Sequence, residues 1–118
     1  HSGHINFLKQ AKKMGDYLIV GIISDEDVES YKRIPIISFQ ERKIMLENCK
    51  QVDKIIPKSP LYISEDFIKK HNINIVVHGD DSKQEEFFDV PIKLGIMKYV
   101  NYTSGISTTE IINRIKNI

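Results

Sequence analysis

Two histidines open the chain, in the tetrapeptide His1-Ser2-Gly3-His4. Ile5, Leu8 and Ala11 follow with the spacing of a helix face, so the pair is expected at the mouth of a helix. A helix N-terminus presents free N–H groups and a positive dipole end, which suit a phosphate. Imidazoles can donate hydrogen bonds to phosphoryl oxygens and stabilise the charge that builds on them. The glycine before the second histidine lets the backbone approach a bulky ligand closely.

The histidine pair also has plainer explanations. Short H-x-G-H strings occur by chance, and terminal histidines are often remnants of an affinity tag. His1 and His4 could also clamp a metal cation. Cys49 is the only cysteine and lies in an expected helix, where it is interpreted as a small buried apolar residue, and no further Cys/His spacing completes a zinc site. The pair alone leaves these alternatives open.

Size and composition narrow the class of protein. A chain of 118 residues is expected to form one domain, residues 1–118, with 41% hydrophobic residues for a core. A formal net charge of +1 argues against a broad nucleic-acid surface, which needs a basic excess. No apolar run reaches membrane-spanning length and no signal-peptide pattern is present. A single cysteine fits a reducing compartment, so a cytoplasmic location is expected.

The elements that must position these residues alternate along the chain. The continuous apolar run at 17–23 predicts a strand buried on both faces, as in a parallel sheet. Capping boxes begin helices at Ser38 and Ser107, and Pro35 makes 34–37 a loop. The order predicts an α/β fold with a doubly wound parallel sheet. The expected helices are 5–14, 38–49, 64–71 and 107–118, and the expected strands are 17–23, 52–56, 74–78 and 99–102.

Polar residues gather at one edge of this predicted sheet. Ser24-Asp25 and His78-Gly79-Asp80-Asp81 follow strands, so both groups are expected at the shared carboxyl edge. The helices that begin near His4 and Ser107 start at the same edge. Two helix starts that favour phosphate, two histidines and several acids on one rim predict a nucleotide site.

Four further candidates each have a structural alternative. Lys32, in a loop after a strand, could reach a triphosphate or be an ordinary surface charge. Arg42 could bind a base or phosphate with its planar fork, or pair with an acid on its own helix. Asp80 could recognise an amine or belong to a turn, and His78 could be a partly buried strand-end residue. No P-loop, G-x-S-x-G or metalloprotease motif is present, so no covalent nucleophile is indicated.

Taken together, these segments resemble the cytidylyltransferase family. The match consists of His1-Ser2-Gly3-His4 for H-x-G-H, Lys32 for the loop lysine, Glu41-Arg42 for the E-R pair, Gly105-Ile106-Ser107-Thr108-Thr109 for G-I-S-T-[ST], and Val52-Asp53 for part of V-D-E. The order and approximate spacing agree over nearly the whole chain. These motifs in register are far more specific than any one of them.

The resemblance implies a Rossmann-like nucleotidyltransferase domain, dimeric through the H-x-G-H region, that joins CTP to a phosphomonoester and releases pyrophosphate. His1 and His4 would hold the triphosphate and stabilise the transition state, with Mg²⁺ accompanying CTP. Lys32 would neutralise phosphate charge on both substrates. The implied nucleotide-binding residues are Gly3, Asp25, Arg42, Gly105, Ile106, Ser107, Thr108 and Thr109. In-line phosphoryl transfer needs such positioning and charge stabilisation rather than a covalent intermediate.

The family's phosphoethanolamine, phosphocholine and glycerol-3-phosphate branches compete as sources of the second substrate. The choline branch has tryptophan in an A-P-W segment, where this chain has Ser59-Pro60-Leu61-Tyr62 and no tryptophan at all. His78-Gly79-Asp80 resembles the H-G-[ND] of the ethanolamine branch, and a carboxylate suits a primary ammonium. The resemblance therefore favours phosphoethanolamine, with phosphocholine second, and implies that Tyr62, His78, Asp80 and Lys32 bind that substrate.

The chain also departs from the family pattern. The G-x-F-D strand that precedes H-x-G-H in the family is absent here, and Tyr102 stands where the family has an arginine. Ethanolamine enzymes carry two such domains in tandem, and the second lacks that arginine. The chain is thus also expected to pair with a second domain or copy, and a weakly active or regulatory CTP-binding domain is the alternative function.

Overall fold

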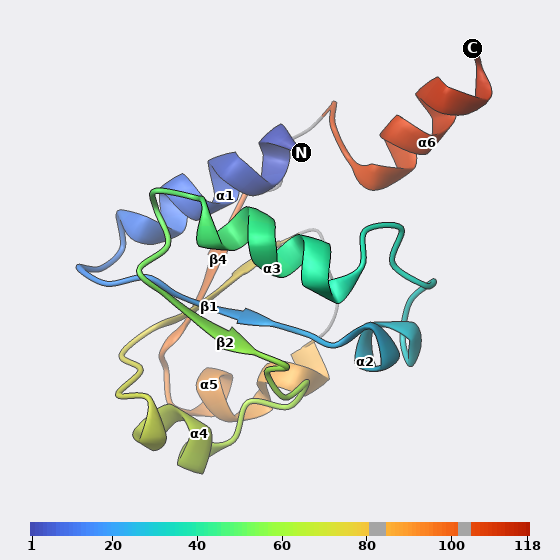
Figure 1. The fold of residues 1–118 in the computed structure, drawn as a ribbon. Coiled ribbons are helices and arrows are strands. Elements are labelled where there is room, and N and C mark those ends of the chain that lie inside the picture. The colour runs from blue at the N-terminus through green and yellow to red at the C-terminus, as the bar shows by residue number, and fades with distance from the viewer. Residues whose placement is uncertain (81–84, 102–104) are drawn as a thin grey trace.

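The computed structural model describes residues 1–80, 85–101 and 105–118. Helices and short strands alternate along nearly all of this length (Figure 1). The elements are α1 (Ser2–Lys12), β1 (Ile19–Ile22), α2 (Asp25–Glu29), α3 (Phe39–Glu47), β2 (Lys54–Pro57), α4 (Glu65–Lys70), β3 (Val76–Gly79), the 3₁₀ helix η1 (Glu85–Phe88), α5 (Asp89–Lys93), β4 (Met97–Val100) and α6 (Thr108–Lys116).

All strand pairing in the described residues is parallel. β1 pairs with β2 from Ile19 opposite Lys54, and β3 pairs with β4 from Val76 opposite Met97. Helices α1 and α3 lie on one side of the strands and α4 and α5 on the other (Figure 1). Parallel strands need crossover connections, and helices on both faces are the usual result. The predicted α/β fold with parallel strands and helices on both faces is confirmed.

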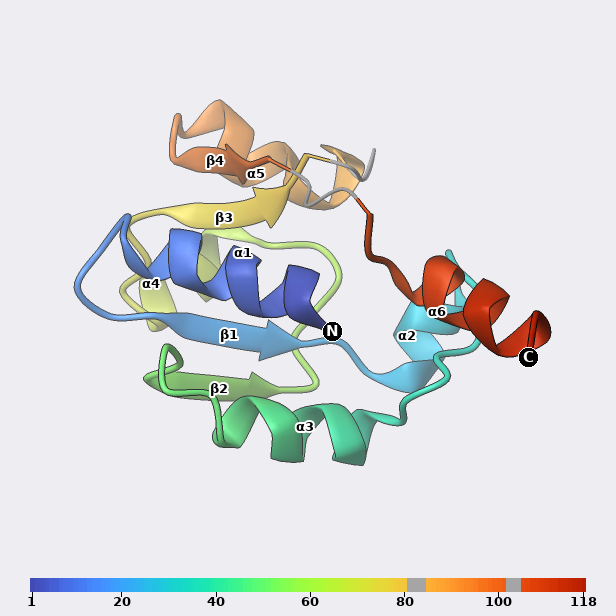
Figure 2. The ribbon, with the colours of Figure 1, turned by 90° about the horizontal axis from the view of Figure 1, so that it is seen from above.

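The strands form two pairs rather than the single sheet that the sequence predicts. In the described part of the chain no hydrogen-bonded ladder joins β1 to β3, although α1 lies over both in the view of Figure 2. Each of these strands is therefore bonded along one edge only. The apolar run at 17–23 contributes a four-residue strand in which only Ile22 is buried. Apolar continuity thus predicts parallel pairing correctly, but it overestimates the burial, because burial also depends on what covers each strand.

Several element boundaries differ from the sequence prediction. The first helix ends at Lys12, two residues earlier than expected, with Lys13 as its cap residue in a right-handed conformation. The last strand lies at Met97–Val100, two residues earlier than expected, and Tyr102 falls outside the described residues. α2, η1 and α5 were not predicted. α2 carries a recognisable N-terminal pattern, since Ser24 caps it and acids fill its first turn.

A small core joins the two pairs to the helices. Its apolar members come from α1, β1, α4, η1, α5 and β4 and are Leu8, Ala11, Ile22, Ile68, Phe87, Pro91 and Val100. α1, α4, η1 and α5 bury one or two side chains each, and α2, α3 and α6 bury none. The polar edge of the strands is thus held by few apolar contacts, and hydrogen bonds between loops carry much of its geometry.

Asp53 ties the opposite, amino end of the first strand pair together. Its Oδ2 accepts hydrogen bonds from the Leu18 main-chain N–H at 2.7 Å and from Lys12 Nζ at 2.5 Å. The V-D segment named above for its family resemblance therefore has a structural role at this end of β1 and β2. The Leu18 N–H, followed by the Lys12 ammonium, lowers the pKa of Asp53 below its ordinary 3.8.

This lowered pKa predicts a contribution of Asp53 to acid stability. A carboxyl whose pKa is depressed in the folded state stabilises the fold above its unfolded pKa, and the stabilisation is lost as pH falls through the folded value. We expect the Asp53→Asn variant to be less stable than the parent at pH 7 and to lose this difference below about pH 3.8. Urea midpoints measured from pH 7 to pH 2 test this. A difference that stays constant down to pH 2 would contradict it.

Gly21 in β1 lies against Ser59, the residue after Lys58 in the turn that ends β2. A Cβ on Gly21 would meet Ser59 Oγ at 2.6 Å and Ser59 Cβ at 2.8 Å, and Ser59 is only 3% exposed. We expect Gly21→Ala to destabilise the protein by about 1–3 kcal/mol, because packed interiors resist added atoms. Denaturant unfolding measures the change. Adding Ser59→Gly should restore part of the loss, whereas Ser59→Ala, which keeps the clashing Cβ, should not.

Candidate functional site

The two histidines form the start of α1. His1 is the N-cap residue, and its Nδ1 accepts a hydrogen bond from the Gly3 N–H at 3.1 Å. The His4 ring turns back so that its Nδ1 lies 3.3 Å from the main-chain nitrogen of His1. The two rings stack, with centroids 3.8 Å apart. An imidazole that accepts at Nδ1 carries its hydrogen at Nε2 when neutral, so the His1 ring offers a donor on its other side.

Gly3 allows the entrance of α6 to approach this histidine pair. A Cβ on Gly3 would lie 2.9 Å from the His1 ring and 3.4 Å from Ile106 Cγ2. The first contact shows that only glycine leaves room for the His1 ring in this position. The second shows that the H-x-G-H and G-I-S-T-T segments, about a hundred residues apart in sequence, meet in the fold.

The entrance of α6 has the geometry of a capped helix start. Gly105 has φ +83°, a left-handed conformation that favours glycine, and turns the chain toward Ile106. Ser107 caps the helix through its Oγ, which accepts from the Glu110 N–H at 3.0 Å. Thr108 and Thr109 are the first two helical residues, where main-chain N–H groups lack helical partners. This part of the chain suits an anion, as α1 does.

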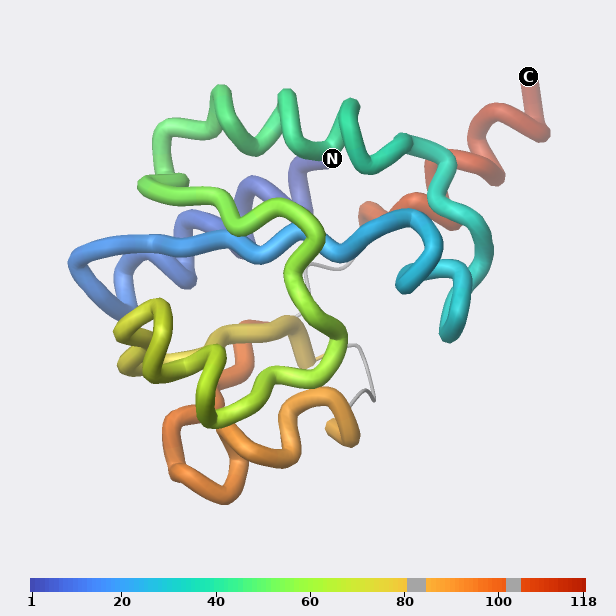
Figure 3. Tube along the Cα trace, turned by 60° about the horizontal axis from the view of Figure 1, so that its bottom comes forward, coloured from blue at the N-terminus to red at the C-terminus, as the bar shows by residue number. Residues whose placement is uncertain are grey.

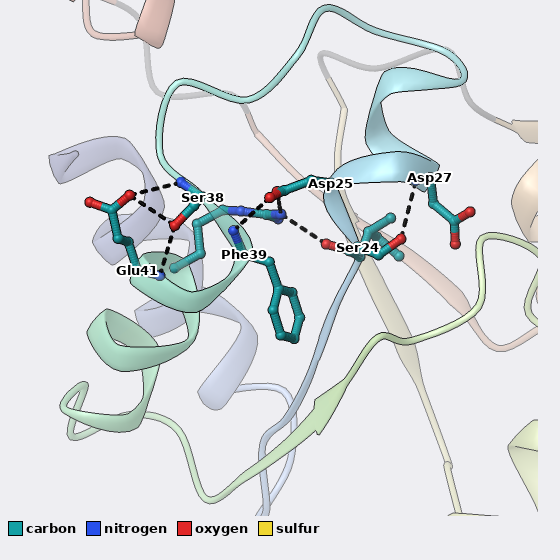
Figure 4. Close-up of polar contacts among 8 residues, drawn as sticks. Ser24, Asp25, Asp27, Ser38, Phe39 and Glu41 are labelled. Carbon is teal, nitrogen blue, oxygen red and sulfur yellow. Dashed lines mark hydrogen bonds and ion pairs between the residues drawn. The ribbon is translucent and has the colours of Figure 1, made fainter.

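Asp25 begins α2, just beyond the end of β1 (Figure 4), and Arg42 lies on α3. Asp25 Oδ1 accepts from Arg42 Nη2 at 2.7 Å, and Asp25 Oδ2 accepts from the Phe39 main-chain N–H at 3.1 Å. Arg42 Nη2 also donates to the Ile23 carbonyl at 2.9 Å. The Phe39 N–H and then Arg42 lower the pKa of Asp25. Both predicted nucleotide-binding residues are thus engaged with the protein itself.

Lys32 follows α2, after the helix that the sequence did not predict. Its main-chain N–H bonds the Val28 carbonyl at 2.9 Å, and its Nζ lies 5.9 Å from the ring centroid of Tyr31. The Tyr31 ring packs edge-on against Phe87, with centroids 5.3 Å apart, and burial raises the pKa of Tyr31. This contact joins the Lys32 segment, which belongs to the β1–β2 half, to η1 of the other half.

Two of the predicted substrate-binding residues pack against the adjacent phenylalanines Phe87 and Phe88. Tyr62 packs against Phe87 with centroids 5.0 Å apart, and His78 lies 4.9 Å from Phe88 by the same measure. His78 Nδ1 is 3.0 Å from the Gly79 carbonyl, so it is this nitrogen that donates. The Asp80 main chain extends the β3–β4 pairing by bonding Val100, and its side chain is exposed.

The structure thus places the predicted residues in two groups at one edge. The N-termini of α1 and α6 lie on the side toward which the strands run, and so does α2 (Figure 2). One group is formed by the helix starts and the histidines, the other by the rings around Phe87 and Phe88. Sequence reasoning missed Tyr31, Phe87 and Phe88. The only indication of them in the sequence is an aromatic pair, Phe87-Phe88, directly after two glutamates.

The chain matches the family described as Cytidylyltransferase-like over residues 1–114. It is 39% identical to the ethanolamine-phosphate cytidylyltransferase of Dictyostelium discoideum over 98% of this chain and 34% of that protein. It is 37% identical to the glycerol-3-phosphate cytidylyltransferase of Staphylococcus aureus, over 94% of this chain and 83% of that protein. It is 32% identical to the choline-phosphate cytidylyltransferase A of Rattus norvegicus, over 98% of this chain and 33% of that protein.

A solved structure agrees with these relatives. A lipopolysaccharide core biosynthesis protein from Thermoplasma volcanium is similar with a TM-score of 0.67 and 30% sequence identity, over 87% of this chain and 86% of that one. A parallel α/β fold with helix starts at its carboxyl edge is typical of nucleotide-binding domains. The chain belongs to the cytidylyltransferase-like family. It spans about a third of the length of the ethanolamine-phosphate relatives that it matches.

No helix among the described residues is long and apolar enough to cross a membrane.

Proposed function

We propose that this domain transfers CMP from CTP to phosphoethanolamine, giving CDP-ethanolamine and pyrophosphate. The observation that carries the proposal is the contact across Gly3, which brings the histidine pair beside Ile106 at the entrance of α6. In this proposal the two helix N-termini and the two imidazoles bind the same triphosphate. That combination suits a triphosphate better than it suits a neutral ligand.

The chemistry follows from charge. In-line attack by the phosphomonoester oxygen on the α-phosphorus of CTP forms one P–O bond and breaks another, with pyrophosphate as the leaving group. Negative charge is spread over the phosphoryl oxygens in the transition state. His1 and His4 donate hydrogen bonds to these oxygens, and Lys32 neutralises charge between the two substrates. The main-chain N–H groups after Ser107 hold the rest of the triphosphate.

Arg42 and the G-I-S-T-T segment complete the nucleotide site in this proposal. The Nη2 atom of Arg42 is engaged by Asp25 and Ile23, while its buried Nε has no partner among the described residues. A buried donor without an acceptor is costly, so a ligand oxygen or a water near this nitrogen is favourable. This supports a CTP contact for Arg42.

Mg²⁺ is proposed to enter with the triphosphate. No group of three or more His, Cys, Asp or Glu side chains in the described ranges could hold a metal ion. Mg²⁺ keeps several waters and is commonly bound through substrate phosphates rather than by a protein cage. When bound it would neutralise triphosphate charge, while the residues named above orient the nucleotide.

The preference for phosphoethanolamine comes from the second group of residues. Its members, Tyr62, His78 and Asp80, combine one exposed carboxylate with polar ring atoms, which suits a primary ammonium that donates hydrogen bonds. The relatives named above act on ethanolamine phosphate, glycerol 3-phosphate and choline phosphate according to their names. The second candidate, phosphocholine, is supported by the aromatic rings of Tyr31, Tyr62 and Phe87, since a quaternary ammonium binds ring faces.

A substrate panel on the whole natural protein tests this proposal. Pyrophosphate release is measured with CTP, Mg²⁺ and each of phosphoethanolamine, phosphocholine and glycerol 3-phosphate. We expect the highest kcat/KM with phosphoethanolamine. Preference for another phosphomonoester would overturn the substrate, and preference for ATP over CTP would overturn the nucleotide. If calorimetry showed CTP binding but no product formed, the domain would be a regulatory CTP-binding domain rather than an enzyme.

We also propose that the domain pairs with a second copy or a tandem domain, and that it works in the cytoplasm. Exposed apolar side chains support the pairing: Ile34 and Ile36 are 65% and 62% exposed in the loop before α3, and Ile115 is 63% exposed on α6. α6 extends away from the strands (Figure 3). Sedimentation equilibrium of the whole protein should give a dimer, or a monomer whose second domain covers these residues.

A further inference from the structure

One carboxylate closes the base of the segment that carries Lys32. Asp25 begins α2 and Phe39 begins α3, 14 residues apart, yet the Phe39 N–H donates to Asp25 Oδ2 at 3.1 Å. A surface segment whose two ends meet in this way is a closed loop held by its own contacts. Figure 4 shows Asp25 between the beginnings of the two helices.

Arg42 completes the closure from the first turns of α3. Its Nη2 reaches Asp25 Oδ1 at 2.7 Å and the Ile23 carbonyl at 2.9 Å. The side chains of Arg42 and Asp25 are 24% and 38% exposed, so the pair is partly shielded from solvent. Charge-assisted hydrogen bonds in such a setting are stronger than those of a fully exposed pair. The end of β1, the start of α2 and the start of α3 are joined at this point.

The Ser38–Glu41 capping box stiffens the same helix start. Ser38 N–H and Oγ donate to Glu41 Oε1 at 3.1 and 2.8 Å, and the Glu41 N–H is 3.3 Å from Ser38 Oγ. The chain therefore enters α3 in one fixed direction. Phe39, the residue after Ser38, therefore has a fixed position, and its N–H holds the Asp25 carboxylate in place.

Lys32 lies at the middle of the closed segment, seven residues from Asp25 and seven from Phe39. Its side chain is exposed, as is that of Arg33. On the far side of the segment, the Tyr31 ring rests on Phe87. Lys32 is thus placed by the base at Asp25 and by one aromatic contact, rather than by burial of its own.

We infer that Asp25, held by its pairing with Arg42, is a positioning residue that holds the segment 26–38 so that Lys32 meets the phosphates. The role of Lys32 rests on the proposed function. Each oxygen of Asp25 already accepts from the protein, and Arg42 neutralises its charge, so this carboxylate can stand beside a triphosphate without binding it. A misplacement of about 1 Å in a positioning group costs on the order of 100-fold in rate, so the closure matters to catalysis.

The first test does not depend on activity. Trypsin cleaves after Lys32 and Arg33, and cleavage of the folded protein reports local opening of the segment. In the whole protein we expect Asp25→Asn and Arg42→Gln to speed cleavage at these two bonds by about tenfold or more, as mapped by mass spectrometry. The matched control is Asp53→Asn, which removes a carboxylate that also bonds one main-chain N–H and one cation, at the other end of β1. Equal cleavage rates in all three variants would overturn the inference.

The second test is a double-mutant cycle in pyrophosphate release. If Asp25 acts through Lys32, Asp25→Asn lowers kcat/KM in the parent and has no further effect in a Lys32→Ala background. If Asp25 binds the nucleotide itself, its effect persists in that background, and the inference is wrong. Arg42→Lys, which keeps the charge, should recover part of the protection from trypsin. A parent without turnover would refute the proposed function, while the cleavage rates would still decide the closure.

Discussion

Replacing His4 by alanine in the whole protein should lower kcat by on the order of 100-fold or more and leave KM for CTP nearly unchanged. The ring lies at the first turn of α1, stacked on His1 at a centroid distance of 3.8 Å, and Gly3, the residue before it, lies against Ile106 at the α6 entrance. Its contribution is greatest when charge builds on the phosphoryl oxygens, so its loss affects the transition state more than the bound substrate. Steady-state kinetics with CTP and phosphoethanolamine measures both constants.

A second histidine provides the control for this prediction. His71 ends α4, where its ring packs on Phe67 at 4.6 Å, away from the helix starts of the site. His71→Ala should change thermal stability more than kcat. If His4→Ala turned over as fast as the parent, the catalytic assignment of the pair would be wrong. An equal loss in both variants would point to folding rather than chemistry.

Lys32→Ala should reduce kcat/KM by on the order of 100-fold at low salt, because a cation between two phosphate groups is removed. The effect should shrink as ionic strength rises, since salt screens the long-range part of the attraction. Lys32→Arg keeps the charge and should recover much of the rate. The measurement is kcat/KM between about 20 and 500 mM KCl, a range over which screening changes several-fold.

Lys69→Ala is the matched lysine control. Lys69 is 73% exposed and pairs with Glu65 one turn away on α4, so its loss should leave kinetics unchanged. Equal losses of kcat/KM in Lys32→Ala and Lys69→Ala would show that net charge, rather than the position of Lys32, governs the rate. If the Lys32→Ala protein had the kinetics of the parent, Lys32 would not be part of the site.

The sequence was most informative where a motif coincides with a helix start. H-x-G-H, the Ser38 box and the Ser107 cap all mark boundaries within a few residues of the observed ones, because capping depends on local chemistry. The parallel pairing of the strands also followed from apolar continuity. These features need no information from distant parts of the chain.

What the sequence could not supply are contacts between segments far apart. Nothing local relates Tyr31 to Phe87, or Asp25 to the N–H of Phe39, because each depends on how crossovers pack. For the same reason the engagement of Arg42 by Asp25 was not anticipated, although both residues were singled out. The separation of the strands into two pairs depends on coverage of β1 and β3, which periodicity does not encode.

The separation of the strands into two pairs also separates the residues proposed to bind the two substrates. Lys32 and Arg42 lie between β1 and β2 in the chain, while His78 and Asp80 lie at the end of β3, with α1 over both pairs in Figure 2. Under the proposed function, substitutions at the end of β3 are therefore expected to change which alcohol is accepted more than they change nucleotide binding. Under the proposed function, related domains of this fold are expected to differ in the alcohol that they accept and still carry out the same reaction at the triphosphate.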